Sequence, residues 1–141
     1  METQNANKIT IESTVNAPVA KAWEYYNGAD HITKWNSPSP DWHCPSASVD
    51  LRPGGKILSR MEAKDGSMGF DFGGVFDTVK TNELVEYTMG DGRKVSTRFI
   101  PSGNTTKVIT TFDPENQNPV DFQKAGWQAI LDSYARYTEA N

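Results

Sequence analysis

Several residue types are scarce in this sequence of 141 residues, and each scarcity excludes a class of protein. The single cysteine, Cys44, cannot form an internal disulfide, which fits a reducing compartment, so we expect a cytoplasmic protein. No apolar run approaches the ~20 residues of a membrane-spanning helix. Basic residues are outnumbered, and the net charge of −4 argues against a nucleic-acid partner.

Motifs for common catalytic chemistry are also missing. The sequence contains no glycine-rich phosphate loop, no Gly-x-Ser-x-Gly nucleophile elbow and no paired cysteines at metal-ligand spacing. We therefore assign no catalytic residue and no metal ligand, and we expect no cofactor.

Aromatic residues are abundant, although leucine is not. The chain has 4 Trp, 5 Tyr and 6 Phe, and each such side chain buries a large area. A chain of this length forms a core without disulfides or a metal. We expect one folded domain over residues 8–141, preceded by a flexible polar segment, residues 1–7.

Alternation of apolar and polar residues predicts most of the strands. Residues 36–47 contain three prolines and no periodicity, which indicates a loop. The expected strands are 8–15, 48–51, 56–64, 69–80, 84–89, 93–100 and 105–112.

Helical spacing predicts three helices. The first follows Asn16, a candidate N-cap, and ends at Asn27; a second short helix covers 29–34. The last covers 119–139, with Asn118 as candidate cap and an apolar stripe that begins at Phe122. This order indicates an α+β fold with helices on one face of an antiparallel sheet.

Seven short motifs, in this order and at this spacing, resemble one superfamily. The motifs are Asn-Ala-Pro-Val-x-x-x-Trp at 16–23, His-Ile-x-x-Trp-Asn at 31–36, Asp-Trp-His-Cys-Pro at 41–45, Asp-Leu-Arg-Pro-Gly-Gly at 50–55, Met-Glu-Ala-Lys-Asp-Gly-Ser at 61–67, Gly-Phe-Asp-Phe-x-Gly at 69–74 and Gly-Trp-Gln-Ala-Ile-Leu-Asp at 126–132. They resemble the START-related SRPBCC superfamily, in the branch of homologues of the activator of the ninety-kilodalton heat-shock-protein ATPase.

The resemblance implies a helix-grip fold, in which a curved antiparallel sheet of about 6–7 strands surrounds a long C-terminal helix, with two short helices after the first strand. It implies a cavity between sheet and helix that binds a hydrophobic or aromatic small molecule, lipid-like or polyketide-like. A cyclase- or hydrolase-like enzyme and a protein-interaction module are the alternatives. The chain lacks the separate N-terminal domain of the eukaryotic chaperone activators, so we do not expect a chaperone partner; a homodimer stays open.

The expected cavity lining combines one face of strand 56–64, one face of strand 69–80 and the last helix, with residues near the proline-rich segment. The alternative is an ordinary packed core. The candidate ligand-binding residues are Trp35, Trp42, His43, Ile57, Ser59, Met61, Phe70, Phe72, Phe76, Val95, Phe99, Trp127, Ile130 and Tyr134. Ser59, His43 and Tyr134 are the polar groups that would orient a ligand.

The segment from Trp35 to Cys44 has several interpretations. It is a structural loop with Trp42 as a plug, or it gates ligand access. His43 is a candidate general base, and it would lower the pKa of the Cys44 thiol if the two side chains met. Asp41, His43 and Cys44 are too close in sequence for an easy tetrahedral metal site.

Three further charged or titratable residues have two interpretations each. Asp71 lies between two phenylalanines and points away from their face, where we expect it to pair with a basic residue on a neighbouring strand. The reverse parity would bury it as a functional carboxylate, and Arg60 faces the same choice. We expect His31 at the surface or in a helix cap.

Overall fold

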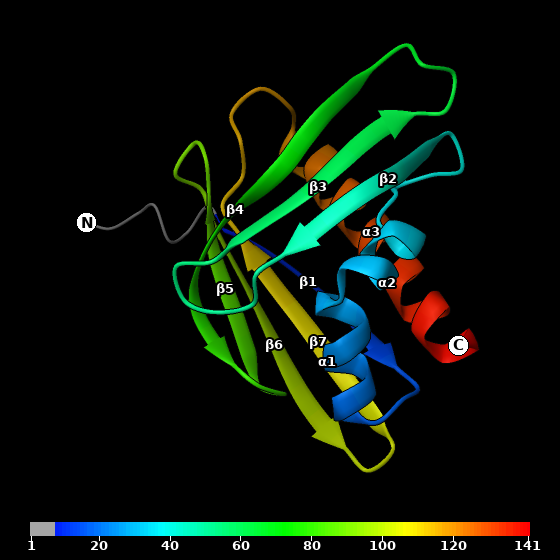
Figure 1. The fold of residues 1–141 in the computed structure, drawn as a ribbon, viewed down its shortest axis with the longest axis vertical. Helices are drawn as coiled ribbons and strands as arrows, with labels where there is room; N and C mark the ends of the chain where they lie inside the picture. Colours follow the sequence, from blue (N-terminus) through cyan, green and yellow to red (C-terminus); the bar gives the residue numbers. More distant parts are fainter. Residues whose placement is uncertain (1–7) are drawn as a thin grey trace.

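The computed structural model describes residues 8–141 as three helices and seven strands (Figure 1). The prediction of a flexible segment over residues 1–7 lies outside the described residues. The elements are β1 (Ile9–Val15), α1 (Val19–Asn27), α2 (Ala29–Trp35), β2 (Trp42–Val49), β3 (Lys56–Ala63), β4 (Gly69–Lys80), β5 (Leu84–Met89), β6 (Lys94–Ser102), β7 (Thr105–Phe112) and α3 (Val120–Ala140).

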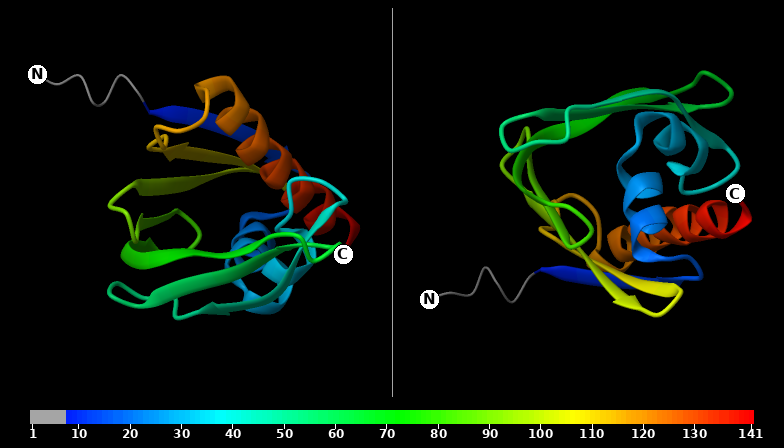
Figure 2. Two further views of the ribbon diagram at one scale, coloured as in Figure 1. Left: turned by 90° about the horizontal axis from the view of Figure 1, so that it is seen from above. Right: turned by 60° about the horizontal axis from the view of Figure 1, so that its bottom comes forward.

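The seven strands form one antiparallel sheet in the order β1-β7-β6-β5-β4-β3-β2. The sheet curls, and the helices lie on its concave side (Figure 2). Helix α3 packs against β1 at one edge, and α2 packs against β2 at the other. The expected α+β helix-grip architecture is confirmed.

Strand β2 corrects the predicted loop. Residues 42–47 were expected to be irregular, but they begin a strand that pairs with β3. Pro45 lies where the register shifts between His43 and Ser46, on an edge strand. Edge strands and bulges are the positions where a sheet tolerates a residue without an N–H.

Helix α1 has a different start from the predicted one. Its N-cap residue is Pro18, and no side chain caps the helix. The backbone N–H of Asn16 instead donates to Glu139 Oε2 at 2.8 Å. The predicted Asn16 cap is therefore wrong, and this segment is joined to the end of α3.

The start of α3 differs from the prediction as well. The N-cap residue is Pro119, without a side-chain cap, so the predicted Asn118 cap is wrong. Phe122 is 68% exposed, and the buried stripe includes Gln123 instead. The Gln123 amide accepts a hydrogen bond from Glu115 N at 2.9 Å and donates to the Asn118 carbonyl at 2.7 Å. These bonds allow a polar side chain to be buried where the apolar one was expected.

None of the helices in the described part of the chain combines the length and the apolarity that crossing a membrane requires.

Candidate functional site

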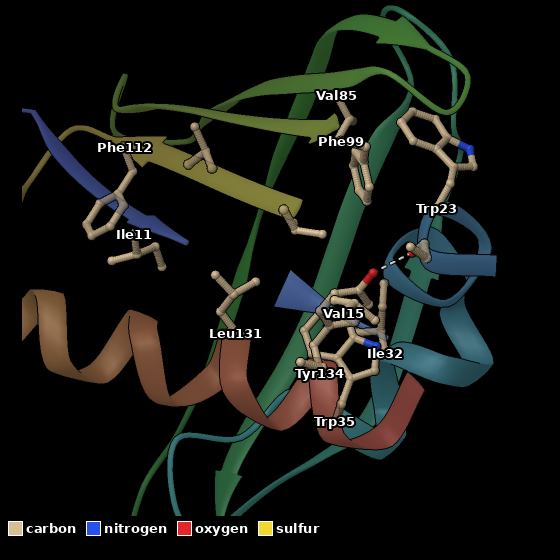
Figure 3. Packing of buried hydrophobic residues seen from close by; sticks show 14 of the residues in the cluster. Ile11, Val15, Trp23, Ile32, Trp35, Val85, Phe99, Phe112, Leu131 and Tyr134 are labelled. Atoms are coloured by element: carbon tan, nitrogen blue, oxygen red, sulfur yellow. Dashed lines mark hydrogen bonds between the residues drawn. The ribbon is translucent and has the colours of Figure 1, made fainter. Parts of the chain in front are cut away.

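A cavity of about 230 Å³ lies between the concave face of the sheet and the helices. Figure 3 shows part of its surroundings, with Leu131 of α3 facing Ile11 of β1, and Trp35 beside Tyr134. The lining residues are Ile11, Tyr26, Ile32, Trp35, Asn36, Ile57, Met61, Phe70, Phe72, Tyr87, Thr110, Trp127, Ile130 and Leu131.

The lining is mostly aromatic and aliphatic, with Asn36 and Thr110 as polar members, and carries no charged side chain among the described residues. Two of its aromatic rings belong to a packed series: Phe72 lies edge-on to Trp127, at 5.9 Å between ring centroids, and Trp127 stacks on Phe112 at 3.9 Å. Phe70 lines the cavity and is 46% exposed, which places it at the mouth. A neutral apolar molecule loses little hydration on entering such a space, whereas a charged one loses much.

Half of the candidate ligand-binding residues line this cavity. They are Trp35, Ile57, Met61, Phe70, Phe72, Trp127 and Ile130. The structure places Phe76, Val95 and Phe99 in the packed core, almost completely buried. Trp42 lies outside the lining and contacts Phe70 edge-on, with ring centroids 5.9 Å apart.

The other lining residues were not among the candidates predicted from the sequence. They are Ile11, Tyr26, Ile32, Asn36, Tyr87, Thr110 and Leu131. Strand parity could have indicated two of them, because Ile11 and Thr110 are register partners on β1 and β7 and therefore share a face. The position of Tyr26 depends on how α1 packs onto the sheet, and sequence patterning does not report that.

The polar side chains expected to orient a ligand have other partners. Ser59 is buried and is a hydrogen-bond partner of Cys44. The hydroxyl of Tyr134 donates to the Ala22 carbonyl at 2.6 Å, and it is completely buried (Figure 3). Neither residue belongs to the lining.

A chain of hydroxyl groups reaches the cavity instead. The hydroxyl of Tyr26 lies 3.1 Å from Thr97 Oγ1, which lies 2.9 Å from Thr110 Oγ1. Burial raises the pKa of Tyr26, while hydrogen bonds from the two threonines lower it in part. Tyr26 therefore stays neutral at physiological pH and keeps its proton for hydrogen bonding.

His43 lies away from the cavity. Its side chain is 44% exposed, and Nε2 lies 3.8 Å from Glu62 Oε1. The described lining contains no imidazole, carboxylate or thiol, so the general-base hypothesis for His43 has no geometric support in this cavity.

Cys44 is a structural thiol. It is buried, and Sγ donates to the Ser46 carbonyl at 3.3 Å. Burial raises the pKa of Cys44, so the idea that His43 activates it as a thiolate is wrong. Within residues 8–141 no three potential metal ligands come together.

We expect this thiol to react slowly in the native protein. A thiol reagent such as Ellman's reagent at pH 7.5 should label Cys44 at least ~10-fold more slowly than the same chain in guanidinium chloride, because the native thiol is buried and protonated. Rapid labelling of the folded protein at pH 6 would contradict the structural role.

The remaining titratable candidates have structural partners. Asp71 is exposed, and Arg60 Nη1 lies 3.4 Å from its Oδ1, which confirms the expected pairing across β3 and β4.

His31, expected at the surface or in a helix cap, lies in the first turn of α2 with its side chain 25% exposed. Its ring stacks on Tyr25 at 3.9 Å and has Nδ1 2.8 Å from the Tyr137 hydroxyl.

A curled antiparallel sheet that holds a long C-terminal helix over an apolar cavity defines the helix-grip class of the SRPBCC superfamily. Within this class, residues 16–139 match the family described as "Activator of Hsp90 ATPase homolog 1-like protein". The chain belongs to this family.

Solved structures agree with this assignment. An AHSA1-like protein from Aeromonas hydrophila is 42% identical with a TM-score of 0.88, over 94% of this chain and 92% of that one. A protein from Cytophaga hutchinsonii is 56% identical with a TM-score of 0.82, over 96% and 94%. One from Nitrosomonas europaea, at 17% identity and a TM-score of 0.82 over 99% and 97%, shares the fold. No curated protein shows significant similarity to the sequence.

Proposed function

We propose that residues 8–141 form one domain that binds a hydrophobic or aromatic small molecule, lipid-like or polyketide-like, in the cavity under α3. The observation that carries the proposal is the uncharged, largely aromatic lining around about 230 Å³.

The size of the space favours binding over an ordinary packed core. Native interiors contain few voids larger than a water molecule, because an empty apolar space forfeits dispersion contacts along its whole wall. An engineered apolar cavity of ~150 Å³ is already large enough to bind benzene. A cavity of about 230 Å³ with a largely apolar wall, open at Phe70, offers few polar partners to water and is therefore suited to an apolar ligand.

A matched pair of substitutions on β3 tests the proposal. Ile57 lines the cavity, whereas its neighbour Leu58 is 46% exposed and does not. Ile57→Trp fills part of the space and should weaken binding of naphthalene and of 1-decanol, the lipid-like probe, at least ~10-fold. Leu58→Trp adds the same ring on the opposite face and should leave both affinities unchanged.

Binding is measured by the rise in melting temperature with probe concentration, since a ligand of the native state stabilises it by mass action. Saturation-transfer NMR gives an independent reading. If neither probe binds the natural sequence, or if both tryptophan variants bind alike, the cavity is not the binding site.

A further inference from the structure

Tyr87 on β5 is the one tyrosine whose hydroxyl has no hydrogen-bond partner among residues 8–141. The other four have partners: Tyr25 with the Asn141 carbonyl, Tyr26 with Thr97, Tyr134 with the Ala22 carbonyl and Tyr137 with His31. Tyr87 is only 7% exposed, and it lines the cavity. Buried phenols normally find a partner, so this one calls for an explanation.

The unpartnered hydroxyl belongs to a polar area on the inner face of the sheet. Tyr87 pairs with Val95 on β6, and Thr97 lies two residues further along that strand, where it pairs with Thr110 on β7. Thr110 and Tyr26 also line the cavity. Three hydroxyl-bearing residues therefore line a space whose only other polar side chain among the described lining residues is Asn36. We call them the hydroxyl floor: Tyr87 and Thr110 on the sheet and Tyr26 on α1.

The hydroxyl floor offers protons. Tyr26, Thr97 and Thr110 carry one hydroxyl proton each, and the hydrogen bonds Tyr26–Thr97 and Thr97–Thr110 use two of these three protons. When each group donates in the same direction, the third proton stays at an end of this series of hydroxyl groups, at Tyr26 or Thr110, and both residues line the cavity. Tyr87 adds a further free donor.

The floor is also neutral. Burial raises the pKa of both Tyr26 and Tyr87, and no lysine, arginine or histidine lies among the described lining residues. An anionic group would lose its hydration here and find no counter-charge in the lining. Arg93, whose charge lowers the pKa of Tyr87 by less than burial raises it, lies outside the lining and is paired with Asp91. A neutral oxygen that accepts a hydrogen bond fits the floor, and a carboxylate does not.

Cavity size limits the rest of the ligand. Scaled from the ~150 Å³ that hold one benzene ring, about 230 Å³ hold roughly one and a half times as many atoms, which is a fused two-ring compound. A long acyl chain would have to extend out past Phe70 at the mouth.

We propose that this cavity selects a small, neutral, fused two-ring aromatic compound with one hydroxyl or carbonyl oxygen, and that Tyr87 is the residue that binds this oxygen. This inference rests on the proposed function and specifies the ligand for the same cavity.

Three probes of one shape test the selection on the full chain at pH 7: naphthalene, 2-naphthol and 2-naphthoate. We expect 2-naphthol to bind ~10-fold more tightly than naphthalene, because one added hydrogen bond is worth about one order of magnitude in affinity. The carboxylate should bind at least ~10-fold more weakly than 2-naphthol.

Tyr87→Phe removes the proposed oxygen contact and keeps the ring. The preference for 2-naphthol over naphthalene should fall to about twofold, while the affinity for naphthalene is unchanged. The melting temperature of the unliganded protein should stay the same or rise, because the variant no longer buries an unpartnered hydroxyl. Tyr25→Phe, whose hydroxyl bonds to Asn141 outside the cavity, is the matched control and should keep the full preference.

The outcomes separate the two proposals. If naphthalene, 2-naphthol and 1-decanol all fail to bind, the proposed function fails. If 1-decanol alone binds, the proposed function stands and the selection of a two-ring compound is wrong. If naphthalene and 2-naphthol bind equally well, or if 2-naphthoate binds best, the cavity binds ligands but the selection proposed for Tyr87 is wrong. A Tyr87→Phe variant that melts at a lower temperature and keeps the natural preference would show that water satisfies the hydroxyl, and would also overturn the inference.

Discussion

Gly74→Ala is expected to destabilise the protein by about 3 kcal/mol, near the upper end of what an overpacked core position costs. A Cβ atom built on Gly74 lies 2.2 Å from the Thr88 carbonyl oxygen and 2.8 Å from its carbon, both backbone atoms of β5. A Cβ atom built on its neighbour Gly73 would meet β3 equally closely, at 2.1 Å from the Ile57 carbonyl oxygen. These two glycines let the middle of β4 bend against both neighbouring strands.

Gly126 provides the control, because it is a glycine without such close neighbours. Gly126 lies inside α3, and a Cβ atom there meets nothing within 4 Å. Gly126→Ala should stabilise the protein by ~0.5–1 kcal/mol, because alanine loses less backbone entropy in a helix. Urea unfolding of both variants measures the two effects, and a Gly74→Ala variant as stable as the natural sequence would show that the sheet bends without this glycine.

The bend also determines the position of the cavity wall. Phe72, two residues before Gly74, lines the cavity, whereas Phe76, two residues after it, is buried in the core. We expect naphthalene affinity of Gly74→Ala to fall together with its stability.

Local patterning was sufficient for strands that have one buried and one exposed face. The predicted ranges 84–89 and 105–112 match β5 and β7, because alternation there follows directly from the pleat. The range 69–80 also matches β4, although burial does not alternate regularly along that strand. Strand β2 contains Pro45 and has no such alternation, and its register comes from pairing with β3. That information lies in tertiary contacts, so the sequence indicated a loop.

The candidate site shows the same division. Periodicity placed Ile57, Met61 and Phe72 on the face that lines the cavity. It gave no way to distinguish a polar side chain with a partner from one without, because partners come from distant elements. Tyr134 bonds to the Ala22 carbonyl, 112 residues away, whereas Tyr87 lacks a partner among the described residues.

Tyr134→Ala should cost about 3–5 kcal/mol, the usual range for truncating a large aromatic core residue. Tyr134 on α3 is completely buried, and its hydroxyl donates to the Ala22 carbonyl of α1 at 2.6 Å. Its ring meets Tyr26 and Trp35 edge-on, with centroid distances of 5.1 and 5.3 Å. One side chain therefore joins α3 to both short helices.

Tyr134→Phe separates the ring from the hydrogen bond. It keeps the edge contacts and should lose only about 1 kcal/mol, the net value of one buried hydrogen bond. Tyr26 and Trp35 line the cavity, so naphthalene should bind Tyr134→Phe as it binds the natural sequence, and Tyr134→Ala more weakly. If urea unfolding gives the two variants the same loss of stability, the hydrogen bond rather than the ring holds the helices together, and the aromatic packing assigned to this junction is wrong.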